Sequence, residues 1–193
     1  MPLITFGNKK LPQTTAIFNM GPALICPSDE LNLCENSKIC YAKKAEKMYK
    51  AVFPHRLKQA EYWLNNSAEN FCSLFHEIYQ RKRIKPRLLR FNESGDFYGQ
   101  DCIIKAEKIA TILRKYPVFV YTYTARRDLD FSNCKNLVVN GSNFMPLGKQ
   151  LFYGNMFKTV GKFSGNNKRC LADCNKCNLC TVNRNYTIEA LKH

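Results

Sequence analysis

The spacing of apolar residues divides much of the chain into helical and extended stretches. Between residues 55 and 80 apolar positions recur every three or four residues, which is the period of an amphipathic helix. Asn65-Asn66-Ser67 interrupts this stretch, and serine is a residue type that caps helix N-termini, so we expect two consecutive helices. The same periodicity predicts a helix over residues 101–115, and a basic helix is expected to begin near Tyr41.

Short runs of β-branched and aromatic residues predict strands. Three central segments have this composition: residues 87–91, 118–123 and 136–139. Two short extended segments are expected around the Gly21-Pro22 turn, and Leu151-Phe152-Tyr153 is a further candidate strand. The final segment NRNYTIEALKH is predicted to form a short tail helix.

The order of the central elements predicts the fold class. A strand, a helix, a strand and a further strand favour parallel pairing with right-handed crossovers. A closed barrel of eight strand–helix repeats needs about 250 residues, and this chain has 193. We therefore predict an α/β fold in which a parallel sheet forms an open, partial β/α barrel over residues 1–160, followed by a cysteine-rich, metal-binding segment over 161–193.

Polar residues follow each of the three central strands. They are Glu93, Ser94, Gly95 and Asp96 after the first strand, Thr122 and Thr124 at the end of the second, and Asn140 and Ser142 at the end of the third. Ligand sites of parallel sheets form at the carboxyl ends of the strands, so these residues are expected to bind a cofactor at one rim. Glu93 and Asp96 are the candidate catalytic residues. The alternative for each residue is an ordinary turn or capping role.

Composition is that of a folded protein, since 45% of the residues are hydrophobic and 12% are aromatic. No targeting segment and no apolar run long enough to span a membrane stands out. We therefore expect no membrane partner and a cytoplasmic location.

Thirty Lys and Arg against fifteen Asp and Glu give a formal charge of +15, which attracts polyanions. The segment RKRIKPRLLR holds the densest basic cluster. Its candidate nucleic-acid-binding residues are Arg81, Lys82, Arg83, Lys85 and Arg87. The alternative is a basic surface that is simply solvated.

Ten cysteines in a reducing compartment favour metal binding or chemistry over disulfides, which remain the alternative. Four of them, Cys170, Cys174, Cys177 and Cys180, occupy the segment CLADCNKCNLC with three, two and two intervening residues. Structural zinc sites usually join two separated pairs, whereas this compressed spacing is closer to that of ferredoxins. The sequence therefore favours an iron–sulfur cluster here, with zinc as the alternative.

A second set, Cys26, Cys34 and Cys40, has seven and five intervening residues and lies in a polar loop. Three ligands leave one metal position open, as catalytic metals require. Alternatively, a fourth ligand closes the site; the candidates are Cys102, Cys134 and His55. Cys72 lies within a helical pattern and is expected to be a core residue.

Four motifs carry a resemblance to a known family. FNMGPALICP, LLRFNESGDF, VYTYT and the terminal cysteine cluster together resemble a family of bacteriophage proteins known as the gene product 88 family. More remotely, three cysteines after the first strand, a partial barrel and a glycine-containing acidic motif are similar to radical S-adenosylmethionine enzymes.

This second resemblance implies specific roles. Cys26, Cys34 and Cys40 would hold a [4Fe-4S] cluster, residues 93–96 would contact the methionine part of S-adenosylmethionine, and the four terminal cysteines would bind an auxiliary cluster. The usual spacing of three and two in those enzymes occurs here only at Cys170-Cys174-Cys177, where it would require a permuted chain.

Three functions are therefore expected, in this order. The first is an iron–sulfur protein with radical-enzyme-like chemistry that could act on nucleic acid. The second is a non-catalytic basic DNA- or RNA-binding protein stabilised by zinc or an iron–sulfur cluster. The third is a protein that binds a host protein through its basic face.

Overall fold

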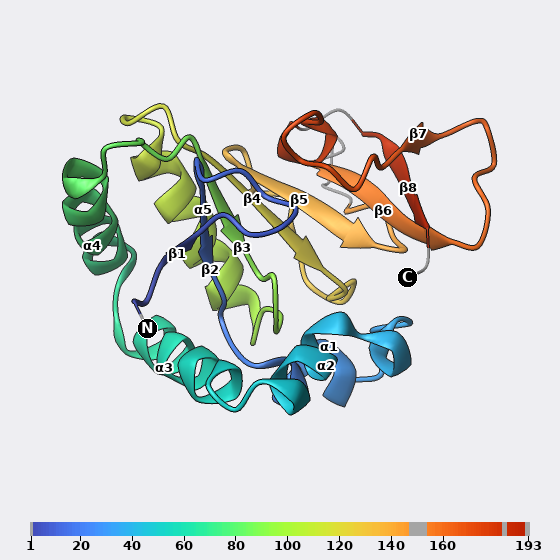
Figure 1. Ribbon diagram of the computed structural model, residues 1–193, viewed down its shortest axis with the longest axis horizontal. Coiled ribbons are helices and arrows are strands. Elements are labelled where there is room, and N and C mark those ends of the chain that lie inside the picture. The colour runs from blue at the N-terminus through green and yellow to red at the C-terminus, as the bar shows by residue number, and fades with distance from the viewer. Residues whose placement is uncertain (1, 147–153, 183–184, 192–193) are drawn as a thin grey trace.

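An eight-stranded, mostly parallel sheet organises the part of the chain that the computed structural model describes, residues 2–146, 154–182 and 185–191 (Figure 1). The strands are β1 (Thr5–Phe6), β2 (Thr15–Phe18), β3 (Leu88–Phe91), β4 (Phe119–Thr124), β5 (Leu137–Ser142), β6 (Gly154–Val160), β7 (Lys168–Arg169) and β8 (Thr187–Leu191). Their spatial order is β1-β2-β3-β4-β5-β6-β8-β7, and the pairing of β1 with β2 is antiparallel. The expected α/β class with a parallel sheet is confirmed.

The helices lie between β2 and β4 in the chain. They are α1 (Pro27–Glu30), α2 (Tyr41–Met48), α3 (Val52–Asn65), α4 (Ala68–Arg81) and α5 (Gln100–Leu113). The predicted start at Tyr41 and the predicted division at Ser67 are confirmed: the Ser67 hydroxyl accepts a hydrogen bond of 3.1 Å from the Asn70 N–H. No helix within the described ranges is long and apolar enough to cross a membrane.

The predicted tail helix is wrong, because residues 187–191 form β8. This strand pairs in parallel with β6, and Ile188 is fully buried there. A five-residue helix is marginal in water. The free edge of β6 instead offers hydrogen-bond partners to the backbone of every second residue of β8. The candidate strand at 151–153 lies outside the described residues. The boundary expected at residue 160 falls at the end of β6, and the chain beyond it returns to the same sheet through β7 and β8.

The two faces of the sheet differ in what covers them. On the helix-covered face, Phe18, Leu89, Phe91 and Val120 pack with residues of α3, α4 and α5 into one apolar core. Alternate residues point to the opposite face. That face, here called the cysteine face, carries Ile17, Arg90 and Tyr121 in one row and packs against the cysteine-rich segment.

The carboxyl ends of β2, β3, β4 and β5 form a common rim. The helices α1 and α2 lie beyond this rim (Figure 1). They belong to the chain between β2 and β3, so the first cysteine loop is positioned over the strand ends.

Candidate functional site

The loop after β2 carries Cys26, Cys34 and Cys40, here called the rim cysteines, and all three are half-buried free thiols. Burial raises the pKa of the Cys26 thiol to about 12, and the Asp96 carboxylate adds to this rise. Burial also raises the pKa of Cys34, with Cys40 and Asp96 among its charged neighbours. The fold thus makes the three rim cysteines and Asp96, which follows β3, electrostatic neighbours.

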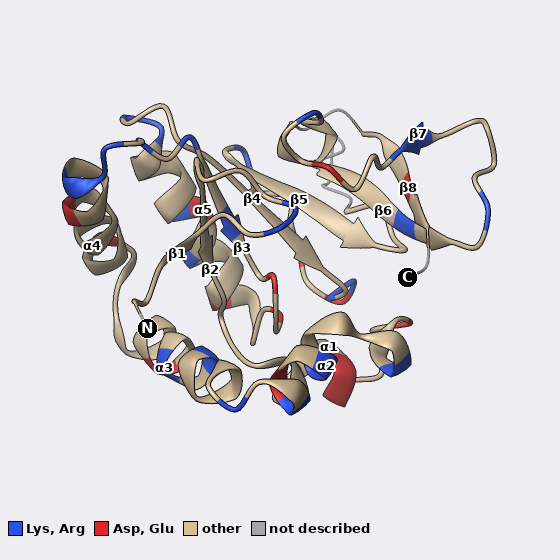
Figure 2. Ribbon diagram, viewed as in Figure 1, with Lys and Arg blue, Asp and Glu red and all other residues tan. Residues whose placement is uncertain are grey.

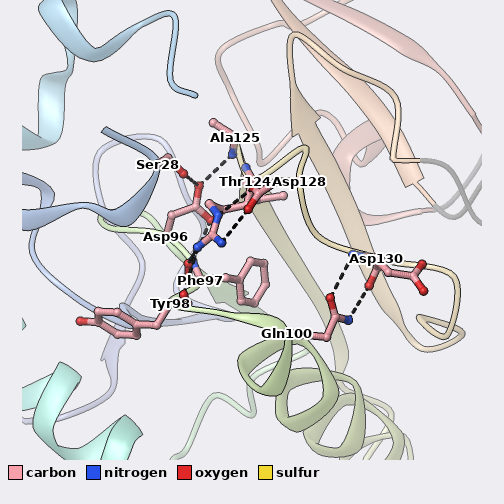
Figure 3. Close-up of polar contacts among 10 residues, drawn as sticks. Ser28, Asp96, Phe97, Tyr98, Gln100, Thr124, Ala125, Asp128 and Asp130 are labelled. Carbon is pink, nitrogen blue, oxygen red and sulfur yellow. Dashed lines mark hydrogen bonds and ion pairs between the residues drawn. The ribbon is translucent and has the colours of Figure 1, made fainter. Parts of the chain in front are cut away.

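Asp96 joins three segments of the rim (Figure 3). Its carboxylate accepts hydrogen bonds from the Ser28 hydroxyl, from the Ala125 N–H at 2.8 Å and from the Phe97 N–H at 2.8 Å. Although these bonds favour its charged form, burial dominates and raises the pKa of Asp96. Asp96 therefore links the rim-cysteine loop to the end of β4.

Ser94 is held by a second buried carboxylate, that of Glu46 in α2. The Ser94 hydroxyl donates to Glu46 at 3.1 Å, and the N–H groups of Ala23 and Leu24 donate to the same carboxylate at 2.7 and 2.9 Å. Arg56 completes this arrangement with an ion pair of 2.6 Å. Glu46 is not among the residues expected from the sequence. The sequence feature that could have identified Glu46 is that it is the single acidic residue in the basic stretch YAKKAEKM.

The glycine of the acidic motif allows two backbones to touch. Gly95 has a φ of +71°, and a Cβ atom there would lie 2.4 Å from the carbonyl oxygen of Gly21. Two asparagines lock the same contact: Asn19 accepts from the Ser94 N–H at 2.8 Å, and Asn92 accepts from the Met20 N–H at 3.3 Å. The motifs FNMG and FNESG are therefore in direct backbone contact and hydrogen-bonded to each other at the rim.

Glu93 lies at the rim with its side chain half-buried. Its carboxylate accepts a hydrogen bond of 2.6 Å from Asn8, and its backbone carbonyl accepts one of 2.7 Å from the Tyr41 hydroxyl. Because Tyr41 directly follows Cys40, Glu93 is also tied to the rim-cysteine loop.

Of the other residues expected at the rim, Thr124 shares a side-chain hydrogen bond with Asp96, whereas Thr122 and Asn140 point elsewhere. Thr122 is fully buried, and alternation along β4 places it on the same face as Val120, away from Tyr121 and Tyr123. Asn140 donates to the carbonyl of Cys180 at 2.9 Å, so it holds the cysteine-rich segment. Ser142 is half-buried at the end of β5.

The second set of thiols forms the four-cysteine site: Cys170, Cys174, Cys177 and Cys180 line one pocket. Tyr121 and Tyr123 of β4 line the same pocket, and the Tyr123 hydroxyl shares a hydrogen bond with Cys180. Burial raises the pKa of the Cys180 thiol to about 12, and the three other thiols are among its charged neighbours. The four terminal cysteines thus lie together against the cysteine face.

Amide side chains attach this segment to the sheet. Asn155 of β6 donates to the carbonyl of Val182 at 2.9 Å. Together with the bond from Asn140 to Cys180, this gives the segment two amide contacts with the sheet. The Cys174 N–H donates to the carbonyl of Lys10 at 3.1 Å, so the segment crosses from β8 back to the chain before β2. It therefore spans the cysteine face near the amino ends of the first strands.

The cysteines considered as a fourth ligand lie elsewhere. Cys102 and Cys134 are buried in the core on the helix-covered face, and Cys102 accepts a hydrogen bond of 3.3 Å from Trp63. His55 belongs to α3, and burial lowers its pKa. Cys72 is buried in the core as expected. Among the described residues, no three Cys, His, Asp or Glu side chains form a preassembled metal site.

The predicted nucleic-acid-binding segment connects α4 to the amino end of β3, at the opposite end of the sheet from the rim (Figure 2). Arg81, Arg83, Lys85 and Arg87 are exposed, and Lys82 is half-buried. Three of the five have side-chain contacts. Arg81 forms an exposed i,i+4 ion pair of 3.9 Å with Glu77. Lys85 donates to the carbonyl oxygens of Tyr79 and Gln80 at the end of α4, and Lys82 lies 4.0 Å from the centre of the Phe6 ring.

Comparison with known protein families identifies a match. A family model described as "Gene product 88" matches residues 2–144, a span that includes the rim cysteines and ends before the four-cysteine site. No curated protein and no solved structure matches the chain.

Proposed function

The chain belongs to the gene product 88 family, and we propose that it is an iron–sulfur protein with radical-S-adenosylmethionine-like chemistry, built on an open, partial β/α barrel. The observation that carries this proposal is that Cys26, Cys34, Cys40 and Asp96 are electrostatic neighbours at the carboxyl rim of a parallel sheet. This is the end of a parallel sheet at which ligands bind.

The strand order supports the partial barrel. The strands β2, β3, β4, β5 and β6 are neighbours in chain order, as in a β/α barrel. The rim-cysteine loop also reaches across the strand ends: Asn36 donates to Thr159 of β6 at 3.2 Å, and Glu35 accepts from Asn143 at 2.8 Å. Contact between a loop after β2 and a strand four positions away is what a curved, partly closed sheet would produce.

The donor set fits a thiolate-bound cluster. Seven of the ten cysteines form two groups, each with free thiols, and the remaining three lie in the apolar core. Because the thiols are not preassembled, loading would draw them together and release their protons. A four-iron cluster with three cysteine ligands keeps one iron open, and in radical enzymes that iron binds S-adenosylmethionine and supplies the electron that cleaves it.

In this proposal the rim residues have separate tasks. The rim cysteines hold the cluster. Asp96 keeps their loop in place through Ser28, and Glu93 presents a carboxylate beside Tyr41 toward the methionine part of the cofactor. The four-cysteine site holds an auxiliary cluster, for which zinc is the alternative metal.

The test is S-adenosylmethionine cleavage by the anaerobically reconstituted, reduced protein. Wild-type protein should release 5′-deoxyadenosine and methionine, and Cys34→Ala should abolish this. Cys72→Ala, which removes a core cysteine, is the matched control and should retain cleavage. Absence of cleavage in wild-type protein that carries a full complement of iron and sulfide would exclude the radical chemistry.

The exposed basic segment favours a second candidate function, a metal-stabilised nucleic-acid-binding protein. Four of its five basic residues are exposed, and no acid interrupts residues 81–90. A triple variant, Arg81→Gln, Arg83→Gln and Arg87→Gln, should weaken binding to DNA or RNA, and the wild-type affinity should fall steeply between 50 and 200 mM salt, by about 10³-fold or more if six phosphates are contacted. Affinity that does not change with salt would refute phosphate contacts.

A further inference from the structure

We propose that Arg90 is the charge partner of the four-cysteine site. Its guanidinium offsets the negative charge that the four thiolates acquire when they bind a metal. This inference rests on the proposed function, because it requires that the four-cysteine site be loaded.

Arg90 lies on the face of the sheet that carries this site. In β3, Leu89 and Phe91 belong to the core on the helix-covered face, so Arg90 points to the cysteine face. It is in register with Tyr121 of β4, and its guanidinium carbon lies 4.8 Å from the centre of the Tyr123 ring. Both tyrosines line the four-cysteine pocket.

Arg90 is half-buried, and the two buried arginines of the described chain both have carboxylate partners. Arg56 pairs with Glu46 at 2.6 Å, and Arg126 pairs with Asp128 at 2.8 Å. Arg90 forms no ion pair with a described Asp or Glu.

Hydrogen bonding also leaves Arg90 incompletely satisfied. Its Nη2 donates to the Tyr41 hydroxyl at the long distance of 3.5 Å. Its Nε is shielded from solvent and has no partner among the described residues. Glu93 is among the charged neighbours of Arg90 but does not pair with it directly. A shielded guanidinium nitrogen without a partner is costly, so this position favours a further negative charge that another group supplies.

The four-cysteine site can supply that charge. Four thiolates carry more negative charge than a zinc ion or an oxidised four-iron cluster neutralises, so the loaded site is anionic. Tyr123 connects the two groups, because its ring stacks on Arg90 and its hydroxyl bonds to Cys180.

The decisive comparison is between metal-free and metal-loaded protein. In a background with Cys26→Ala, Cys34→Ala and Cys40→Ala, only the four-cysteine site would hold metal. There, Arg90→Met should weaken metal retention against a chelator on the order of tenfold, and Arg90→Lys should restore most of it. Arg114→Met is the matched control, because Arg114 is exposed and stacks on Phe119 at 4.3 Å.

The melting temperature provides the readout that a purely structural role would not change. Without metal, Arg90→Met should melt at the same temperature as its parent or higher, because an unpaired shielded charge is removed. With metal, it should melt lower. Equal destabilisation in both forms, or unchanged metal retention, would overturn the role of Arg90. A parent that holds no metal would instead overturn the proposed loading of the site.

Discussion

The two cysteine sites are held in place by different chemistry. The rim-cysteine loop is fixed by buried carboxylates, since Asp96 bonds to Ser28 and Glu46 bonds to Ala23 and Leu24. The four-cysteine segment is attached by the amides of Asn140 and Asn155 and by a few backbone bonds.

Under the proposed function, this difference predicts that the two sites depend on metal to different degrees. The rim loop has enough internal bonds to keep its shape without a ligand, and two of its carboxylates, Asp29 and Glu46, are paired with cations. The four-cysteine segment has less support and faces a cation, Arg90. It should therefore gain more order from a bound metal than the rim does.

The largest expected effect is at the contact between the two rim loops. Gly95→Ala combines a positive φ with a Cβ 2.4 Å from the Gly21 oxygen, so unfolding free energy should fall by about 3 kcal/mol or more. Gly165→Ala, also at positive φ but in open space, should cost about 1 kcal/mol. Urea unfolding would measure both. Equal losses would mean that the close contact at the rim adds nothing.

Metal removal should affect the four-cysteine segment next. After chelation, amide hydrogens of residues 168–182 should exchange on the order of a hundredfold faster, whereas residues 22–40 should change by less than about tenfold. Hydrogen-exchange mass spectrometry before and after chelation would measure this. A larger change in the rim loop would reverse the comparison.

Loss of one amide attachment should have an intermediate effect. Asn155→Ala removes the bonds to Asn140 at 3.1 Å and to Val182 at 2.9 Å, as well as the acceptor for the Tyr186 N–H at 3.1 Å. The expected loss in unfolding free energy is about 2 kcal/mol, since buried groups lose their partners. Metal retention should fall along with stability. If Asn155→Ala has normal stability and normal metal retention, the amide of Asn155 does not hold the four-cysteine segment in place.

The smallest effect concerns an ion pair at the rim. Lys43 and Ser37 hold the pKa of Asp29 below its ordinary value, so this pair stabilises the fold above about pH 4 and the contribution is lost as the pH falls further. Asp29→Asn should cost roughly 0.5 kcal/mol at pH 7 and nothing near pH 2. Urea unfolding at both pH values tests this, and an equal cost at both would exclude the ion pair as its source.

Periodicity suffices to predict most of the fold. The division at Ser67 and the central strands follow from local spacing and capping, which depend on neighbouring residues alone. The strand in the tail cannot be predicted in this way, because residues 187–191 form a strand by pairing with β6. That partner is about thirty positions away in the chain, beyond the reach of a local pattern.

The sequence predicts which residue types form the candidate site, but it does not predict the face of the sheet on which each side chain lies. Cysteine spacing separates two groups from the core cysteines, and strand ends locate the acidic motif. Which face a strand residue occupies depends on pairing, so the sequence alone places Thr122 at the rim although it lies in the core. The sequence signal for Arg90 is a charge inside the apolar strand LLRF, and only the pairing of β3 shows which face that charge occupies.

Metal analysis of anaerobically purified protein tests the central claim most directly. The account predicts a brown protein with about eight iron and eight sulfide per chain, from two four-iron clusters. A double variant, Cys177→Ala and Cys180→Ala, should hold about half of each. A colourless protein with stoichiometric zinc and no iron would contradict the account.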